Sequence, residues 1–283
     1  MKHSLVLRCA GRPVGRYAYR NDLDRRLSPR PYLHPVTTLA GTPVTELAPA
    51  DHPHHLGAGV AVPDVAGHNF WGGRTFVRGR GPVDLGNHGV QRHRDFKLHD
   101  PDGFVEELTW TVAEDAAGEV LLRERRTVAA TELDATAWAL DFTFSLTNVT
   151  GGEVSFGSPA TNGRPGAGYG GFFWRAPKES APPHVFTAAA EGEAAVHGAR
   201  ADWLALAGDG WTLVFAGATA RTRHDPWFVR VAEYPGVGSS LASEDRLATA
   251  PGDTVVRRVV TVVADGALKR DEATALVRRA VTV

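Results

Sequence analysis

The sequence predicts an all-β protein, a large antiparallel β-sandwich that forms a single domain over residues 1–283. Apolar and polar residues alternate with a period of two in several stretches, which is the pattern of strands buried on one face. The 31 glycines and 18 prolines divide the chain into many short runs, as turns do in antiparallel proteins. A helical pattern occurs only close to the C-terminus, so we expect few helices.

The first half of the chain contains a predicted hairpin and two further strands. Residues 5–9 and 14–19 flank the turn sequence Gly11-Arg12-Pro13, which predicts that they pair. Residues 120–129 alternate less regularly. The clearest strand is Ala137–Asn148, in which every second residue is large and apolar: Trp138, Leu140, Phe142, Phe144 and Leu146.

The second half contains another hairpin, a long strand and a helix. Residues 203–207 and 211–217 are separated by Gly-Asp-Gly and predict a hairpin. Residues 254–264 follow Pro-Gly-Asp and predict a long final strand. Residues 272–281 predict a terminal helix, for which Asp271 is a suitable N-cap residue.

Composition restricts the functional classes. The 31 basic and 32 acidic residues give a formal net charge of -1, which argues against a nucleic-acid-binding protein, since such a protein needs a basic surface. The single cysteine excludes an intramolecular disulfide and a multi-cysteine zinc or iron–sulfur site. Arginine far outnumbers lysine and isoleucine is absent, which indicates a GC-rich, actinobacterial-type genome.

The sequence predicts neither a membrane span nor a targeting signal. The longest apolar runs are much shorter than the roughly 20 residues that a spanning helix needs. The N-terminus reaches Arg8 too soon to contain the apolar region of a signal peptide. We therefore expect a cytoplasmic protein without a membrane partner.

The first candidate site is the run Asp51-His52-Pro53-His54-His55. In an extended conformation, His52 and His54 point to one face and His55 to the other. Two imidazoles with this spacing can bind one metal ion, with Asp51 orienting a ring, or one imidazole can act as a general acid or base. Solvated loop histidines are the structural alternative.

A second group of polar residues surrounds His93. If Arg92 and Arg94 face solvent on a strand, His93 points inward, which is unusual for a core strand. Glu106 and Glu124 place carboxylates on neighbouring predicted strands, and a buried carboxylate beside an imidazole forms an acid–base pair. Glu124 lies among three arginines, so a surface ion pair is the alternative.

Two later segments combine aromatic residues with arginine. The glycine-rich segment 162–174 ends in Phe-Phe-Trp and precedes Arg175. Aromatic faces beside an arginine suit a polyhydroxylated ring, although the same aromatic residues could fill the sandwich core. Segment 221–230 contains Trp227 and Arg230 and predicts either the rim of a ligand pocket or a polar turn with Trp227 in the core.

These segments, in this order, resemble those of the PmoA-like family. Members carry an Arg-Pro-Tyr segment, a Pro-Asp-His-Pro-His-His-Arg-Gly motif, a Phe-Trp pair, a later arginine and a Pro-Trp segment that ends in arginine. The corresponding residues here are Arg30-Pro31-Tyr32, Asp51-His52-Pro53-His54-His55-Leu56-Gly57, Phe70-Trp71, Arg175 and Pro226-Trp227-Phe228-Val229-Arg230. The chain departs from the family at Leu56, where arginine is usual, and at Ala216-Gly217-Ala218-Thr219-Ala220, where a segment like Asp-His-Pro-x-Asn is usual.

The resemblance implies a fold and a chemistry. The family is similar to the galactose-mutarotase-like supersandwich proteins, large β-sandwiches that occur in sugar epimerases and glycan-processing enzymes. The label methane oxygenase, which the family often carries, belongs to an integral membrane protein and does not fit a chain without a predicted span. The resemblance therefore implies a carbohydrate-related function.

Our first functional hypothesis is a carbohydrate-handling enzyme with a histidine-based acid–base site on the concave face of the sandwich. Mutarotation, epimerisation, elimination or hydrolysis of a sugar or glycoside each need a base and an acid. The candidate catalytic residues are His54, His55, His93 and Glu124. The candidate substrate-binding residues are Arg30, Tyr32, Trp71, Arg175, Trp227 and Arg230. This mechanism requires no cofactor, and a homodimer is compatible with it.

Two alternatives stay open at this point. The first is a metal-dependent enzyme in which His52, His54 and His93 bind zinc, manganese or iron. The second is a non-catalytic sugar-binding protein. The departures at Leu56 and at residues 218–220 favour it if the family's polar residues at those positions bind substrate.

Overall fold

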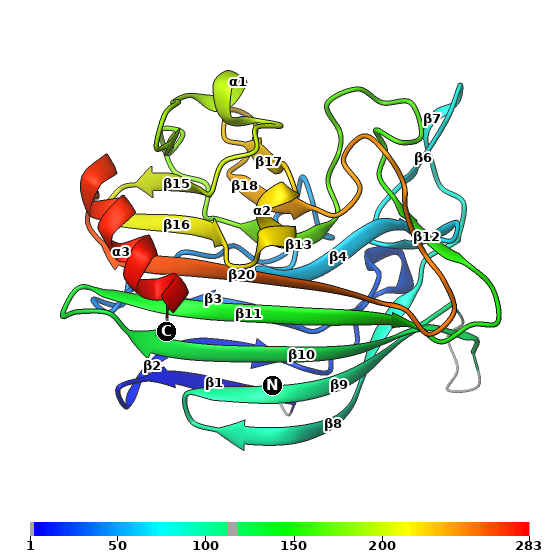
Figure 1. Ribbon diagram of the computed structural model, residues 1–283, viewed down its shortest axis with the longest axis horizontal. Coiled ribbons are helices and arrows are strands. Elements are labelled where there is room, and N and C mark those ends of the chain that lie inside the picture. Colours follow the sequence, from blue (N-terminus) through cyan, green and yellow to red (C-terminus); the bar gives the residue numbers. More distant parts are fainter. Residues whose placement is uncertain (1–2, 113–117, 283) are drawn as a thin grey trace.

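The computed structural model describes residues 3–112 and 118–282. These residues form two large antiparallel sheets, of ten and eight strands, with one hydrophobic core between them (Figure 1). A small two-stranded sheet pairs β6 (Thr75–Val77) with β7 (Gly81–Val83). The prediction of an all-β sandwich with few helices is confirmed.

The ten-stranded sheet carries the N-terminal hairpin at one edge. Three short strands lie off its main path: β5 (His68–Phe70) and β12 (Val154–Gly157) pair with β4, and β19 (Leu247–Thr249) pairs with β12. The main path runs in the order β1 (Ser4–Cys9), β2 (Arg12–Ala18), β3 (Tyr32–Val36), β4 (Ala58–Val65), β13 (Gly171–Arg175), β18 (Gly236–Ser240) and β17 (Trp227–Arg230).

The eight-stranded sheet contains the strands that the sequence predicts most clearly. β11 (Ala137–Asn148) pairs with β10 (Val120–Glu132) on one side and with β20 (Thr254–Asp265) on the other, and its alternate large residues fill the core. Phe142, for example, stands opposite Val128 and Val259, and all three side chains are buried. The strand order is β14 (His184–Thr187), β15 (Trp203–Gly208), β16 (Trp211–Gly217), β20 (Thr254–Asp265), β11 (Ala137–Asn148), β10 (Val120–Glu132), β9 (Gly103–Thr111) and β8 (Val90–Asp100).

The predicted first hairpin is present, but its second strand begins at Arg12 rather than at residue 14. The turn consists of Ala10 and Gly11, whose φ angles are 46° and 80°. A two-residue turn with positive φ matches the twist of paired strands. Pro13 therefore lies inside β2 and not in the turn.

Helices cover little of the sandwich. The 3₁₀ helix η1 (Arg25–Leu27), α1 (Glu193–Val196) and α2 (Ala220–His224) are all short. The predicted terminal helix is α3 (Arg270–Thr282), which packs on the outer face of the eight-stranded sheet (Figure 1). No helix in the described ranges is long and apolar enough to cross a membrane.

The helix α3 begins two residues earlier than predicted. The helix begins at Arg270, so Asp271 lies inside its first turn instead of at the N-cap. The Glu272 carboxylate accepts a hydrogen bond from the Lys269 N–H at 2.7 Å. This bond satisfies a free backbone donor, which is the purpose of a cap.

The outer face of the ten-stranded sheet holds the candidate site. Along β13, Phe172 and Trp174 point into the core between the sheets. Because side chains alternate along a strand, Phe173 and Arg175 point to the opposite face. There Phe173 packs with Trp71, and the loops around β4, β13 and β17 come together.

Candidate functional site

A cavity of about 300 Å³ opens on this outer face. Four segments line it: residues 51–55 before β4, residues 71–74 after β5, residues 164–169 before β13, and residues 228–234 in β17 and the turn after it. We call residues 51–55 the His loop and the space the His-loop cavity. A volume near 300 Å³ lies at the small end of ligand pockets and suits a small ligand.

The His loop is folded into two turns and is not extended. The His52 N–H donates to the Pro49 carbonyl and the His55 N–H to the His52 carbonyl, both at 2.9 Å. The Ala48 N–H donates back to the His55 carbonyl at 2.8 Å. An extended strand would place His55 opposite His52 and His54, but the turns bring all three rings to one cavity.

The three imidazole rings are in mutual contact. The ring centroids of His52 and His55 are 4.6 Å apart at an interplanar angle of 24°, and those of His54 and His55 are 4.8 Å apart at 81°. Gly72 makes this close packing possible. A Cβ atom on Gly72 would lie 2.7 Å from the Cβ of His54, and its φ of 101° also favours glycine.

Arg30 holds the His loop in place from behind. Its guanidinium donates to the carbonyls of His54 at 2.7 Å, Trp71 at 3.0 Å and Leu27 at 3.0 Å. The residue is buried. Arg30 is a predicted substrate-binding residue, and the structure places its guanidinium on the backbone of the cavity wall.

Hydrogen bonds assign opposite tautomers to His52 and His55. His52 Nδ1 lies 2.9 Å from the Asp51 carboxylate, which can only accept, so Nδ1 carries a proton and, in the neutral form of the ring, Nε2 has the lone pair. His55 Nδ1 lies 3.2 Å from the Arg175 guanidinium, which can only donate, so Nδ1 accepts and the neutral ring carries its proton on Nε2. Two stacked rings therefore offer one acceptor and one donor nitrogen.

Burial keeps two of the three rings neutral. Desolvation, followed by the charge of Arg30, lowers the pKa of His54 to about 3. Desolvation, followed by the neighbouring His54, lowers the pKa of His55 far below its usual range. The hydrogen bond from His52 lowers the pKa of Asp51, so this carboxylate is ionised at neutral pH.

Arg175 connects the His loop to β13. Its guanidinium contacts the Glu46 carboxylate at 2.8 Å and lies 4.7 Å from the ring centroid of Tyr234. The Arg175 side chain is fully buried. It therefore acts on the cavity through His55 and Tyr234, which are its neighbours there.

Aromatic residues form the floor of the cavity. The ring centroids of Trp71 and Tyr169 are 4.6 Å apart, and those of Tyr169 and Phe228 are 5.3 Å apart. Arg230 lies over Phe228 at 4.9 Å and donates to the Gly166 carbonyl at 3.1 Å. Trp71 and Arg230, both predicted substrate-binding residues, line the same cavity as the histidines.

Two predicted substrate-binding residues lie elsewhere. Tyr32 is buried against Ala18 and Leu56, so Leu56 serves packing in this chain. Trp227 points into the sandwich core, where its Nε1 donates to the Ala201 carbonyl at 2.8 Å. The next residue of β17, Phe228, faces the cavity in its place, since adjacent side chains of a strand point to opposite faces.

His93 and Glu124 belong to a buried polar network between the sheets. His93 Nδ1 donates to Glu106 at 2.7 Å, and Tyr17 donates its hydroxyl proton to the other oxygen of Glu106. Glu124 accepts two hydrogen bonds from Arg126, at 2.7 and 3.0 Å. Glu124 and Arg126 are buried, so the alternative of a surface ion pair is wrong. They face inward because β10 alternates, with Arg123 and Arg125 exposed.

The structure separates the predicted metal ligands. His52 and His54 line the His-loop cavity, whereas His93 lines a different one. Within the described ranges, no three His, Cys, Asp or Glu side chains are grouped so that they could hold a metal ion. In the His loop, the Nδ1 atoms of His52 and His55 are instead occupied by hydrogen bonds with Asp51 and Arg175.

Sequence reasoning missed several residues that line the His-loop cavity. Arg164 and Tyr169 lie in the glycine-rich segment 162–174, whose aromatic content was a visible signal. Arg74, Glu233 and Tyr234 stand alone in sequence and carry no motif. The departure at residues 218–220 lies outside the cavity, where Thr219 caps α2.

Comparison with known protein families gives a match over nearly the whole chain. A family model matches residues 4–278. The chain belongs to DUF6807, a family of unknown function. No curated protein matches this chain. Membership therefore assigns no reaction, and the chemistry has to be inferred from the site.

Proposed function

We propose that this DUF6807 protein is a carbohydrate-handling enzyme whose acid–base site is the His-loop cavity. The observation that supports this most strongly is the pair of stacked imidazoles with opposite tautomers, His52 and His55. An acceptor nitrogen and a donor nitrogen in one small cavity are what proton transfer at a sugar requires.

In this proposal His52 is the base. Asp51 holds its Nδ1–H, so Nε2 is oriented and available to take a proton. The Asp51 carboxylate also stabilises the imidazolium that forms. The predicted catalytic residues are His54, His55, His93 and Glu124. Of these, His55 is kept, as the hydrogen-bond donor, and His52 is added as the base.

His55 is the proposed donor. Its Nε2–H hydrogen-bonds to the sugar oxygen that gains electron density, and Arg175 fixes this tautomer. In mutarotation, His52 removes the anomeric hydroxyl proton as the C1–O5 bond breaks, the His55 Nε2–H stabilises the negative charge that develops on O5, and the His52 imidazolium then gives its proton to O5. Rotation about C1–C2 and the reverse steps then give the other anomer. The sequence of steps is balanced and needs no cofactor.

The remaining walls suit a sugar ring. Trp71, Tyr169 and Phe228 offer flat apolar surface for C–H groups. The charged side chains of Arg74, Arg164 and Glu233 line the same space and can bond to hydroxyl groups. The reaction class beyond proton transfer, whether mutarotation, epimerisation, elimination or hydrolysis, depends on the sugar that this cavity selects.

The test is a panel of aldoses and glycosides with the variants His52→Gln and His55→Gln. Anomer exchange and product formation are followed by proton NMR, and binding by saturation-transfer difference. We expect each variant to lower turnover about 10²–10⁴-fold, whereas His99→Gln, at an exposed position of β8, leaves it unchanged.

The same experiment separates the alternatives. Sugar binding without conversion by the wild-type protein would favour the non-catalytic hypothesis. Unchanged rates in both His-loop variants would contradict the proposed mechanism, and the absence of binding across the panel would contradict the carbohydrate function.

A further inference from the structure

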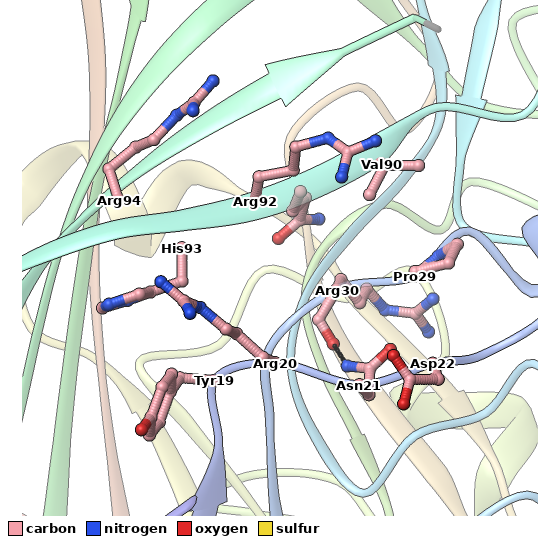
Figure 2. Close-up of a pocket in the computed structure, with 11 residues that line it drawn as sticks. Tyr19, Arg20, Asn21, Asp22, Pro29, Arg30, Val90, Arg92, His93 and Arg94 are labelled. Atoms are coloured by element: carbon pink, nitrogen blue, oxygen red, sulfur yellow. Dashed lines mark hydrogen bonds between the residues drawn. The ribbon is translucent and has the colours of Figure 1, made fainter. Parts of the chain in front are cut away.

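A second cavity, of about 330 Å³, lies beside His93. Figure 2 shows Tyr19, Arg20, Asn21 and Asp22 on one wall and the start of β8, with His93, on the other. We call it the His93 cavity. It is separate from the His-loop cavity, and Arg30 lies in the wall between them because it lines this cavity and bonds to the carbonyl of His54 in the other.

The His93 cavity is strongly cationic. Four arginines line it, Arg20, Arg30, Arg92 and Arg94, against one carboxylate, Asp22, among the described residues. Figure 2 shows Arg92 and Arg94 projecting from the side of β8 opposite His93, so they contribute charge near the rim. Arg20 reaches into the space from the other wall.

Among the described residues, Arg20, Arg30 and Arg94 have no carboxylate partner. Within the same residues, Arg30 donates only to backbone carbonyls, among them those of Ser28 at 3.1 Å and His54 at 2.7 Å. Burial, followed by the nearby charge of Arg126, lowers the pKa of Arg30 to about 9. Arg20 has no hydrogen-bond or ion-pair partner within residues 3–112 and 118–282. The cavity therefore holds positive charge that the described part of the protein does not neutralise.

His93 supplies an oriented polar group at the same place. Its side chain is 7% exposed, and Nδ1 is occupied by the fully buried Glu106 carboxylate. The Tyr17 hydroxyl donates to this carboxylate and accepts a hydrogen bond from Arg126, which fixes the carboxylate between the sheets. Nε2 is therefore the ring nitrogen of His93 that is left for a ligand.

We propose that the His93 cavity is a second binding site, for a small molecule that carries an oxyanion, either a carboxylate or a phosphate. Arg20 pairs with the anion, since a guanidinium matches two oxygens at once. His93 Nε2 forms a second hydrogen bond to the ligand, and Arg30 and the rim arginines provide the positive field. This site does not depend on the sugar chemistry of the His-loop cavity.

The test follows the ring nitrogens of His93 by proton–nitrogen NMR of histidine-labelled protein. The protein is titrated separately with inorganic phosphate and with succinate, at constant ionic strength set with chloride. We expect saturable shifts of the His93 signals with at least one of the two anions. The anion that binds with the lower Kd then shows whether the site prefers a phosphate or a carboxylate.

The variant Arg20→Gln should weaken this binding about tenfold or more, because it removes a charge-assisted contact. The control Arg125→Gln removes an arginine from the exposed face of β10 and should leave the affinity unchanged. Two results would overturn the proposal: no saturable shift with either anion, or equal affinity of the Arg20→Gln variant and the wild-type protein.

Discussion

The His-loop cavity and the His93 cavity both contain an imidazole held by a carboxylate, but the two pairs have different surroundings. His52 lies 2.9 Å from Asp51, whose side chain is 50% exposed, and His93 lies 2.7 Å from Glu106, whose side chain is 0% exposed. The first pair sits on a loop at the His-loop cavity, where we propose that it exchanges protons with a ligand. The second is part of a network that joins the two sheets, so its disruption affects the fold.

The largest expected effect is a loss of stability, and it tests whether the buried network around Glu106 and Glu124 supports the fold. Glu124→Gln leaves Arg126 buried without its charge partner, so we expect a loss of about 3–5 kcal/mol in the free energy of unfolding. Denaturant unfolding measures it. Glu107→Gln, at an exposed position of the neighbouring strand, is the control. A loss below about 1 kcal/mol would mean that the buried network contributes little to stability.

The second prediction concerns turnover, and it tests whether the His-loop cavity alone carries the proposed reaction. His52→Gln should lower sugar turnover about 10²–10⁴-fold, because the base is lost. His93→Gln should leave turnover close to the wild-type value, since His93 lines the other cavity. Steady-state kinetics on the same substrate compare the two variants. Equal losses would show that both cavities serve one reaction.

The third prediction concerns pH. The pKa values of His54 and His55 are lowered by folding, so the unfolded chain binds more protons than the native protein below about pH 6.5. The free energy of unfolding therefore does not depend on these rings above that pH. Below it, the free energy of unfolding falls by about 1 kcal/mol per pH unit for each ring, until the pH reaches the native-state pKa of that ring. Unfolding of the wild-type protein at pH 7 and pH 5 should show this slope.

His55→Gln is the matched variant for the pH experiment, because it removes one of the two rings. Its stability should fall less steeply between pH 7 and pH 5 than that of the wild-type protein. The same slope in both proteins would mean that His55 is protonated as easily in the native state as in the unfolded state.

The smallest expected effect is the change in the stability of the protein when the half-exposed Asp51–His52 pair is altered. Asp51→Asn should change the free energy of unfolding by no more than about 0.5 kcal/mol, because the side chain is half exposed. Turnover should fall all the same, since His52 loses its orienting acceptor. A large loss of stability would place Asp51 with the buried network instead of the loop.

The fold was predictable because long strands repeat their pattern. β11 alternates over its whole length, and α3 combines apolar spacing with an acidic first turn. The choice between Trp227 and Phe228 was not predictable, since β17 has only 4 residues and no periodic signal. A shift of one position along a strand moves a side chain from the core to the cavity, because adjacent side chains face opposite sides of the sheet.

The candidate site was predictable only in part for a related reason. The His loop was visible as a dense run, but its turns depend on hydrogen bonds to Pro49 and Ala48 that no spacing rule indicates. Tyr234 and Arg74 reach the cavity from distant segments and have no local signal. The residue types pointed to acid–base chemistry, and the folded loop decides which nitrogen accepts and which donates.

The most direct test of the central claim is the tautomeric state of the two stacked histidines. Proton–nitrogen NMR of histidine-labelled protein, assigned with His52→Gln and His55→Gln, distinguishes a ring protonated at Nδ1 from one protonated at Nε2. We predict a proton on Nδ1 of His52 and on Nε2 of His55 at neutral pH. The same tautomer on both rings, or a positively charged His55, would contradict this prediction.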